Sequence, residues 1–135
     1  MLGFLGVTTV AKTVLNNLEM EKRIFSLEKF LDRKDKVGYA AARNTRILKN
    51  SAQEYLTRRD ELISEYGEPE LDAEGNQTGR KYLDMRSENY KKYEEAIAEY
   101  ASIEHVVDIF TIPFESVEGV LTGSEILMLD WMLEE

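Results

Sequence analysis

Few residues of this chain have the types and spacing that catalysis requires. His105 is the single histidine, and no nucleophile motif, phosphate-binding glycine loop or second histidine accompanies it in its apolar run. The acidic pairs Glu94 with Glu95 and Glu134 with Glu135 are adjacent in sequence, so their side chains diverge around a helix. The sequence therefore predicts a structural role for His105 and a protein that is not an enzyme and uses no cofactor.

One loop has the residue types of a calcium site. Within GEPELDAEGNQTGRK, residues 67–81, Asp72, Glu74 and Asn76 occupy alternate positions. The glycine precedes Asn76 instead of following it, and no glutamate stands at the twelfth position of the loop, so the EF-hand geometry is not met. We predict a solvated turn with a small hairpin around Gly75 and Asn76, and no metal site.

The charged residues are distributed unevenly along the chain. A formal net charge of −9 argues against non-specific binding of nucleic acid by the chain as a whole. Residues 29–59 carry nine basic and three acidic groups, whereas residues 60–135 carry five basic and twenty acidic groups. We expect the basic segment to lie against acidic segments of the same chain.

The segment VGYAAARNTRILKN, residues 37–50, combines very small and basic residues. Gly38, Ala41 and Ala42 predict a close approach of neighbouring backbone, with Tyr or Trp side chains filling the space above them. Asn44 is predicted to be a buried polar residue that fixes the packing register. The candidate residues for binding a partner are Tyr39, Arg43, Asn44, Arg46 and Trp131.

Apolar residues at helical spacing predict two long helices. The first covers 35–66 and ends where Gly67 and Pro69 follow, and the second covers 82–101 with a seam rich in tyrosine. A loop of about fifteen residues joins them, and such helices most simply fold back as an antiparallel hairpin. The fold is therefore expected to be mainly α, built on this long hairpin.

Shorter elements complete the expected single domain of residues 1–135. The run IEHVVDIFTIPF predicts one short strand or extended segment over 103–112, whose partner is the loop hairpin, an N-terminal segment or another subunit. Thr122 and Glu125 have the spacing of a capping box, which predicts a short C-terminal helix over 123–133.

The N-terminal segment MLGFLGVTTVAKTVL is expected to be the first core segment, leading to a short N-terminal helix. It lacks the basic start of a signal peptide and is too short to cross a bilayer. The chain has no cysteine, which suits a reducing compartment. We therefore expect no membrane association and a cytoplasmic location in the host cell.

Three stretches of the sequence resemble one family: LEKFLDRKDKVGYAAARN at 27–44, ELISEYGE at 61–68 and IPFESVEGVLTGSEILMLDWMLEE at 112–135. Together, in this order, they are similar to a group of small uncharacterised helical proteins encoded by bacteriophages and prophages. Gly123 departs from the pattern, which usually has proline there. The resemblance implies a phage or prophage context and a helical fold, and it transfers no activity.

These observations predict a non-enzymatic phage or prophage accessory protein that acts by binding a protein of the phage or its host. It would serve either as an assembly factor or as an inhibitor of a host protein. Self-association is a further way to bury its apolar surface. The alternative is an acidic mimic of nucleic acid, or a direct nucleic-acid binder, that interferes with a host nuclease or DNA-binding protein. The direct binder would use basic residues of the first long helix: Lys36, Arg43, Arg46, Lys49, Arg58 and Arg59.

Overall fold

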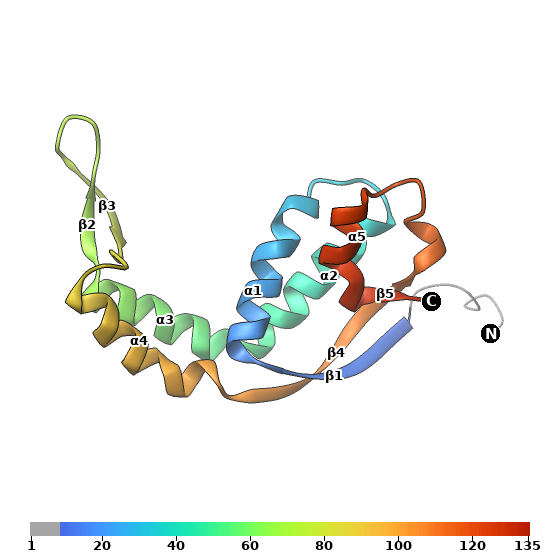
Figure 1. Ribbon diagram of the computed structural model, residues 1–135, viewed down its shortest axis with the longest axis horizontal. Helices are drawn as coiled ribbons and strands as arrows, with labels where there is room; N and C mark the ends of the chain where they lie inside the picture. Colours follow the sequence, from blue (N-terminus) through green and yellow to red (C-terminus); the bar gives the residue numbers. More distant parts are fainter. Residues whose placement is uncertain (1–8) are drawn as a thin grey trace.

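The computed structural model describes residues 9–135, and this part of the chain is a mixed α/β fold (Figure 1). Its order is β1 (Thr9–Asn16), α1 (Asn17–Leu27), α2 (Lys36–Ser51), α3 (Gln53–Tyr66), β2 (Glu68–Leu71), β3 (Gln77–Tyr82), α4 (Glu88–Ala101), β4 (Glu104–Pro113), α5 (Gly123–Leu129) and β5 (Leu133–Glu134). Three short 3₁₀ turns lie between these elements. The expectation of a mainly α fold with one short strand is therefore wrong, because five strands in two sheets accompany the helices in the described range.

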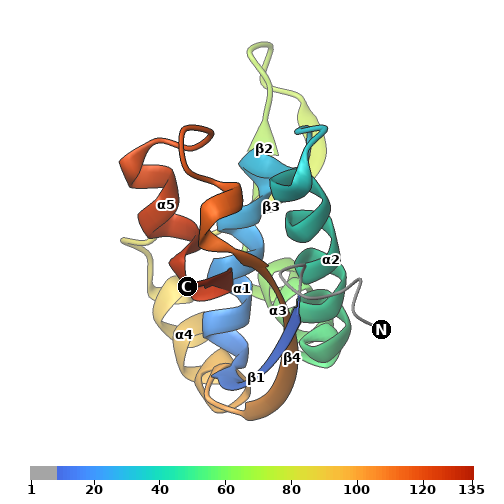
Figure 2. The same cartoon turned by 90° about the vertical axis from the view of Figure 1, so that its right-hand side faces the viewer.

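A pair of long strands organises what we call the body, residues 9–51 and 104–134. β1 runs antiparallel to β4 over its whole length, from Thr9 opposite Thr111 to Asn16 opposite Glu104, and β5 adds a short parallel pairing to β4. The predicted strand at 103–112 thus pairs with an N-terminal segment, the second of its three expected partners. Figures 1 and 2 show α1, α2 and α5 gathered on one side of this ribbon.

The prediction that residues 1–15 form the first core segment can be compared with the structure only from residue 9 onward, because residues 1–8 lie outside the described range. Residues 9–16 form a strand, and only Leu15 of that strand belongs to the main hydrophobic core. The expected N-terminal helix corresponds to α1, which starts with a capping box between Asn16 and Glu19.

A second unit, which we call the arm, consists of residues 53–101. α3 and α4 pack antiparallel, and the exposed β2–β3 hairpin extends from their far end (Figure 1). Its core is small: Tyr55, Leu62 and Ile97 are its buried residues, and Leu56 packs against both this cluster and the core of the body. The hairpin predicted around Gly75 is confirmed, and Gly75 adopts a left-handed φ of 83° in its turn.

The prediction of a long helical hairpin is therefore wrong, because only the second half of its first helix, α3, packs against α4. The segment 35–66 is two helices that meet at Ala52, which leaves helical geometry with φ −97° and ψ 9°. Only α3 pairs with α4, while α2 packs against α1 and β4. The buried small residues Gly38 and Ala41 consequently face the body, and Ala42 is exposed, so no tyrosine of the second helix covers them.

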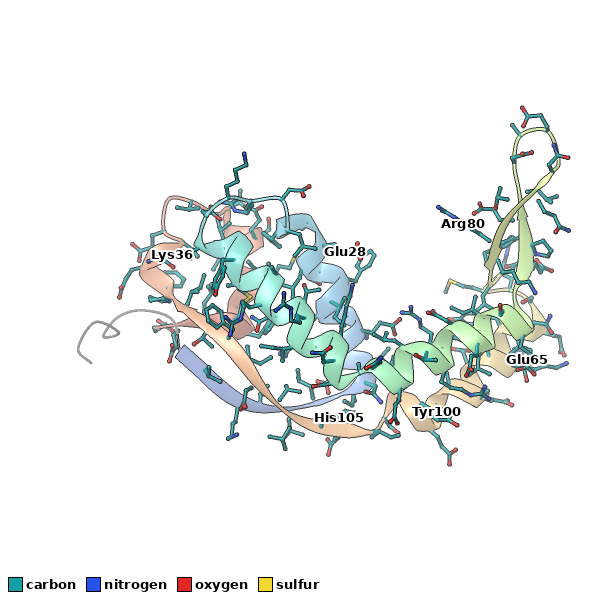
Figure 3. All side chains as sticks on the ribbon, turned by 180° about the vertical axis from the view of Figure 1, so that it is seen from behind. Glu28, Lys36, Glu65, Arg80, Tyr100 and His105 are labelled. Carbon is teal, nitrogen blue, oxygen red and sulfur yellow. The ribbon has the colours of Figure 1, made fainter. Side chains whose placement is uncertain are left out.

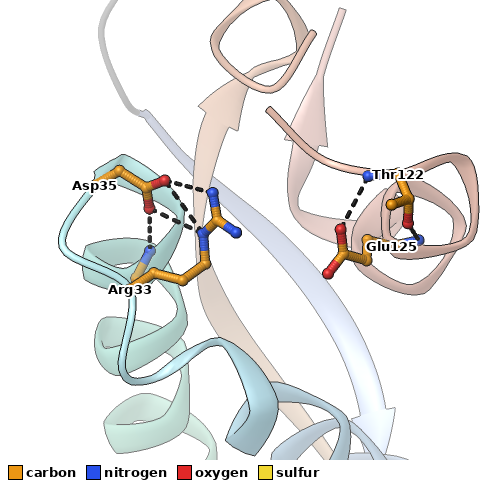
Figure 4. A network of polar contacts seen from close by, with 5 residues as sticks. Arg33, Asp35, Thr122 and Glu125 are labelled. Carbon is orange, nitrogen blue, oxygen red and sulfur yellow. Dashed lines mark hydrogen bonds and ion pairs between the residues drawn. The ribbon is translucent and has the colours of Figure 1, made fainter. Parts of the chain in front are cut away.

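Local polar contacts fix the starts of α2 and α5 (Figure 4). Asp35 caps α2 by accepting from the Gly38 N–H at 3.2 Å, and the Arg33 guanidinium holds the same carboxylate. The hydrogen bonding of the Arg33 side chain to the Asp35 carboxylate is the main reason that the pKa of Asp35 is lowered. At α5, Thr122 and Glu125 form the capping box that their spacing predicts.

The C-terminal helix is shorter than the prediction over 123–133. α5 ends at Leu129, a 3₁₀ turn covers Asp130–Met132, and Leu133 and Glu134 enter the sheet as β5. Across residues 9–135, no helix has both the length and the apolar character needed to cross a bilayer.

Candidate protein-interaction surface

The main candidate surface is the outer edge of β1. In the three-stranded sheet the order is β1, β4, β5, so β1 lies at an end with no described strand on its other side. The opposite edge of β4 is covered by α2 and β5. An eight-residue edge strand presents a row of backbone donors and acceptors, and such a row is a template for pairing with another chain.

Asn44 reveals which backbone groups point toward that open edge. The Phe110 N–H donates to Asn44 Oδ1 at 2.7 Å, and Asn44 Nδ2 donates to the Phe110 carbonyl at 2.8 Å. Both polar groups of Phe110 thus point away from β1, so Phe110 and Val10 are a non-hydrogen-bonded pair. Because such pairs alternate along an antiparallel ladder, Lys12 and Val14 also direct their N–H and C=O groups to the open edge.

The side chains beside this edge form an unusual exposed apolar face. Val10 is 61% exposed, Val14 55% and Val106 67%, and the register places them on the same face of the ribbon. Between them, Lys12 Nζ lies 3.1 Å from Asp108 Oδ1, so these two opposite charges offset each other. The valines remain available for contact with a partner.

A groove of about 470 Å³ adjoins this face, between the ribbon and α2. Ile47, Val106 and Phe110 supply apolar lining, and Arg43 supplies a cation. The Arg43 guanidinium lies 4.9 Å from the centre of the Phe110 ring and donates to Tyr39 Oη at 3.0 Å. Arg43 forms no ion pair with a carboxylate of the described residues, since Asp108, which also lines the groove, pairs with Lys12, so Arg43 can meet an anionic group from another molecule.

The predicted site residues do not form one cluster. Tyr39, Arg43 and Asn44 converge on Phe110, but Asn44 is fully buried and supports the surface from beneath. The prediction that Asn44 is a buried, hydrogen-bonded polar residue is confirmed. Arg46 is exposed on α2 and is not among the residues that line the groove.

Trp131 lies in a different part of the body, against α1. Its ring is half-buried, its Nε1–H donates to the Met128 carbonyl at 3.1 Å, and the Arg23 guanidinium stacks 4.6 Å from its centre. Burial lowers the pKa of Arg23, and the neighbouring Glu19 opposes that shift. The tryptophan therefore has partners within the chain and is separate from the groove.

The residues considered for catalysis and metal binding lie in separate elements, His105 in β4 and Asp72 in the turn after β2. His105 is half-buried at the start of β4, opposite Leu15 and near Tyr100 at the junction of the arm and the body (Figure 3). The Asp72 carboxylate accepts from the N–H groups of Glu74 and Asn76, as in a turn. In residues 9–135 no three acidic or histidine side chains lie close enough together to hold a metal ion.

The exposed valines of the ribbon were not predicted from the sequence. The β-branched residues Val10, Thr13 and Val14 favour a strand, but apolar and polar residues do not alternate there, so no pattern marks the exposed face. The apolar character of the first fifteen residues led instead to their assignment as core. Phe110 was missed because its contact with α2 is not visible in the sequence.

Comparison of the chain with family models, with curated proteins and with solved structures gives no match. The resemblance to phage and prophage proteins therefore remains a prediction.

Proposed function

We propose that this chain is a non-enzymatic accessory protein of a phage or prophage that binds another protein by accepting an extended segment as an additional strand beside β1. The observation that carries the proposal is the edge of β1, where the backbone groups of Val10, Lys12 and Val14 pair with no strand of residues 9–135 and lie next to exposed valines. The phage context comes from the family resemblance alone. The partner protein would be either one that the chain assists in particle assembly or a host protein that it inhibits.

Strand addition suits the composition of this edge. Main-chain hydrogen bonds supply affinity in this binding mode, while side-chain contacts at alternate positions supply specificity. Three outward-facing residues match a partner segment of about five or six residues, since strand residues alternate in direction. Lys12, in the middle, disfavours indiscriminate pairing with other edges, and Asp108 offsets its charge once a suitable partner binds.

Two substitutions at one position separate backbone pairing from side-chain effects. Lys12→Pro removes an N–H that points to the open edge, whereas Lys12→Ala removes the same side chain and keeps that N–H. Both variants lose the exposed ion pair to Asp108, which contributes at most about 1 kcal/mol. Affinity capture from infected and uninfected bacterial lysates, with mass spectrometry, should retain a protein on the wild type and on Lys12→Ala, and much less of it on Lys12→Pro.

A folding control completes this experiment. The Thr13 N–H points toward β4, so Thr13→Pro should reduce the thermal stability of the fold, while Lys12→Pro should not. In the captured complex, hydrogen exchange should slow at Val10, Lys12 and Val14. Equal capture by Lys12→Pro and Lys12→Ala, or no retained protein at all, would contradict strand addition.

A second candidate is direct binding of nucleic acid, and one observation favours it. The expected internal neutralisation is found for Arg58 and Arg59 of α3, which form ion pairs with acidic residues. In contrast, the exposed residues of α2 make no ion pair with a carboxylate of the described chain: Lys36, Arg43, Arg46 and Lys49. A mobility-shift assay at low salt tests it. Binding that is lost when Arg43 and Arg46 are changed to Glu would support this candidate, and no shift with the wild type would remove it.

A further inference from the structure

A second surface of the molecule has the chemistry of a cation-binding pocket. A cavity of about 540 Å³ lies along α4, from Tyr90 to Ser102, beside the starts of α1 and α3. Tyr55, Tyr90 and Tyr93 line it together with the carboxylate-bearing Glu21 and Glu94, and Ile97 contributes an apolar wall. Of the described residues, no lysine, arginine or histidine lines this cavity.

The two carboxylates of the pocket differ in how they are neutralised. Glu21 accepts from the Tyr55 hydroxyl at 2.6 Å and forms an ion pair with Arg59, which lies outside the lining. Glu94 is exposed on α4 and has no ion-pair partner in the described chain. The pocket therefore has one carboxylate available to a ligand.

The tyrosines supply neutral aromatic surface beside this charge. The rings of Tyr90 and Tyr93 lie 6.2 Å apart at an angle of 36°. Burial, with the nearby Glu21 carboxylate, raises the pKa of Tyr93, and burial with the hydrogen bond to Glu21 raises that of Tyr55. Both phenols are protonated at neutral pH, as an unshifted tyrosine would be, and they offer neutral aromatic surface that attracts cations.

We propose that this pocket binds the guanidinium or ammonium group of an arginine or lysine side chain presented by another protein. The aromatic rings would contact the flat or alkyl part of that side chain, and Glu94 would neutralise its charge. An acidic, tyrosine-lined cavity without a resident cation is complementary in charge to such a group. This proposal does not depend on strand addition at β1, which lies on a different surface.

The test is a titration with N-acetyl-arginine amide, followed by NMR of tyrosine ring resonances in the full-length protein. Tyr90 and Tyr93 should show saturable shifts, while the exposed Tyr39 of α2 should not. N-acetyl-citrulline amide has nearly the same shape without the charge, and it should cause no saturable shift. Putrescine serves as a free diamine, and binding of putrescine alone would overturn the assignment to a protein side chain.

Adjacent glutamates of α4 give a matched pair of variants. Glu94→Gln removes the pocket carboxylate, whereas Glu95→Gln removes the same charge from an exposed position outside the lining. Glu94→Gln should lower the affinity for N-acetyl-arginine amide about threefold to tenfold, and Glu95→Gln should change that affinity less than about twofold. Equal effects of the two variants, or shifts that never saturate, would overturn the proposal.

Discussion

Asn44 shows how one polar residue connects a helix to a sheet. Its amide bonds to both backbone groups of Phe110 in the way that a neighbouring strand would, and it thereby closes an edge of β4. The side chain is 0% exposed, so neither partner has access to water if the pair is broken. The residue type and apolar flanks predicted burial, whereas the identity of the partner required the fold.

Replacing Asn44 should therefore reduce stability more than an ordinary polar substitution. Asn44→Leu leaves the N–H and C=O of Phe110 unpaired in the core, which should cost about 2–4 kcal/mol of unfolding free energy. Urea denaturation measures this loss. Asn50→Leu, on the exposed end of the same helix, should stay within about 0.5 kcal/mol of wild type, and a similar loss in both variants would contradict this role for Asn44.

The raised pKa of Tyr55 predicts that the stability of the fold decreases at alkaline pH. Burial and the hydrogen bond to Glu21 raise its pKa above the ordinary value of 10.0, so the folded chain holds this proton more tightly than the unfolded chain. The corresponding stability is fully present below about pH 10, and it is lost as the pH rises from there toward the folded-state pKa.

Tyr55→Phe removes both the hydrogen bond and this titration. At pH 7 the variant should be about 1–3 kcal/mol less stable than wild type, because Glu21 loses a donor. The difference in stability between wild type and Tyr55→Phe should shrink between pH 10 and pH 11, as measured by the midpoints of urea denaturation. Tyr39→Phe, at a 56% exposed ring, is the control and should show neither effect; a constant difference for Tyr55→Phe across that pH range would refute the linkage.

At the scale of elements, glycines mark two places where backbones meet. A Cβ on Gly38 would lie 2.0 Å from the Arg33 carbonyl oxygen, since the chain before α2 folds tightly onto the helix start. A Cβ on Gly67 would lie 2.4 Å from the Ile63 carbonyl, and this glycine has φ −78° instead of the positive φ expected for a helix stop. Close approach, not conformational freedom, explains both positions.

Gly38→Ala should consequently lower the melting temperature, with a loss of about 1–3 kcal/mol from the backbone shift that it forces. Gly123→Ala is the matched control, because its Cβ would meet nothing within 4 Å and the residue lies in a helix. That variant should be neutral or more stable by up to about 1 kcal/mol. Differential scanning calorimetry checks both, and a Gly38→Ala protein as stable as wild type would disprove the contact.

For the whole molecule, the main feature is the unequal packing of the body and the arm. The body contains most of the buried residues, whereas Tyr55, Leu62 and Ile97 form the small core of the arm. Regions with few buried apolar contacts open at lower free energy than a well-packed core. The arm should therefore exchange its amide hydrogens through local opening, before the body unfolds.

Leu62→Ala tests this difference. Leu62 is 1% exposed, and its truncation should cost about 2–4 kcal/mol within the arm. Hydrogen exchange should become faster in α3 and α4 and remain nearly unchanged in the paired strands β1 and β4. Leu71→Ala, at a 58% exposed position of β2, should alter neither region. An equal increase of exchange in α3 and β4 would show that the two units open together.

Sequence alone determined the features that depend on near neighbours in the chain. Helix α3 ends at Tyr66, the capping box of α5 forms at Thr122 and Glu125, and the 72–77 turn forms its hairpin, because each needs only residues a few positions apart. The strand over 104–113 was also visible, since its β-branched run is continuous.

Tertiary structure alone decided the break at Ala52, the pairing of β4 with β1 and the open edge that follows from it. Ala52 has helical neighbours on both sides and no proline or glycine, so the bend arises because α2 packs on the body while α3 packs on α4. Similarly, the β-branched residues Val10, Thr13 and Val14 indicate a strand but not which of its edges is covered. Both choices depend on contacts between segments about twenty to one hundred residues apart, which no local pattern encodes.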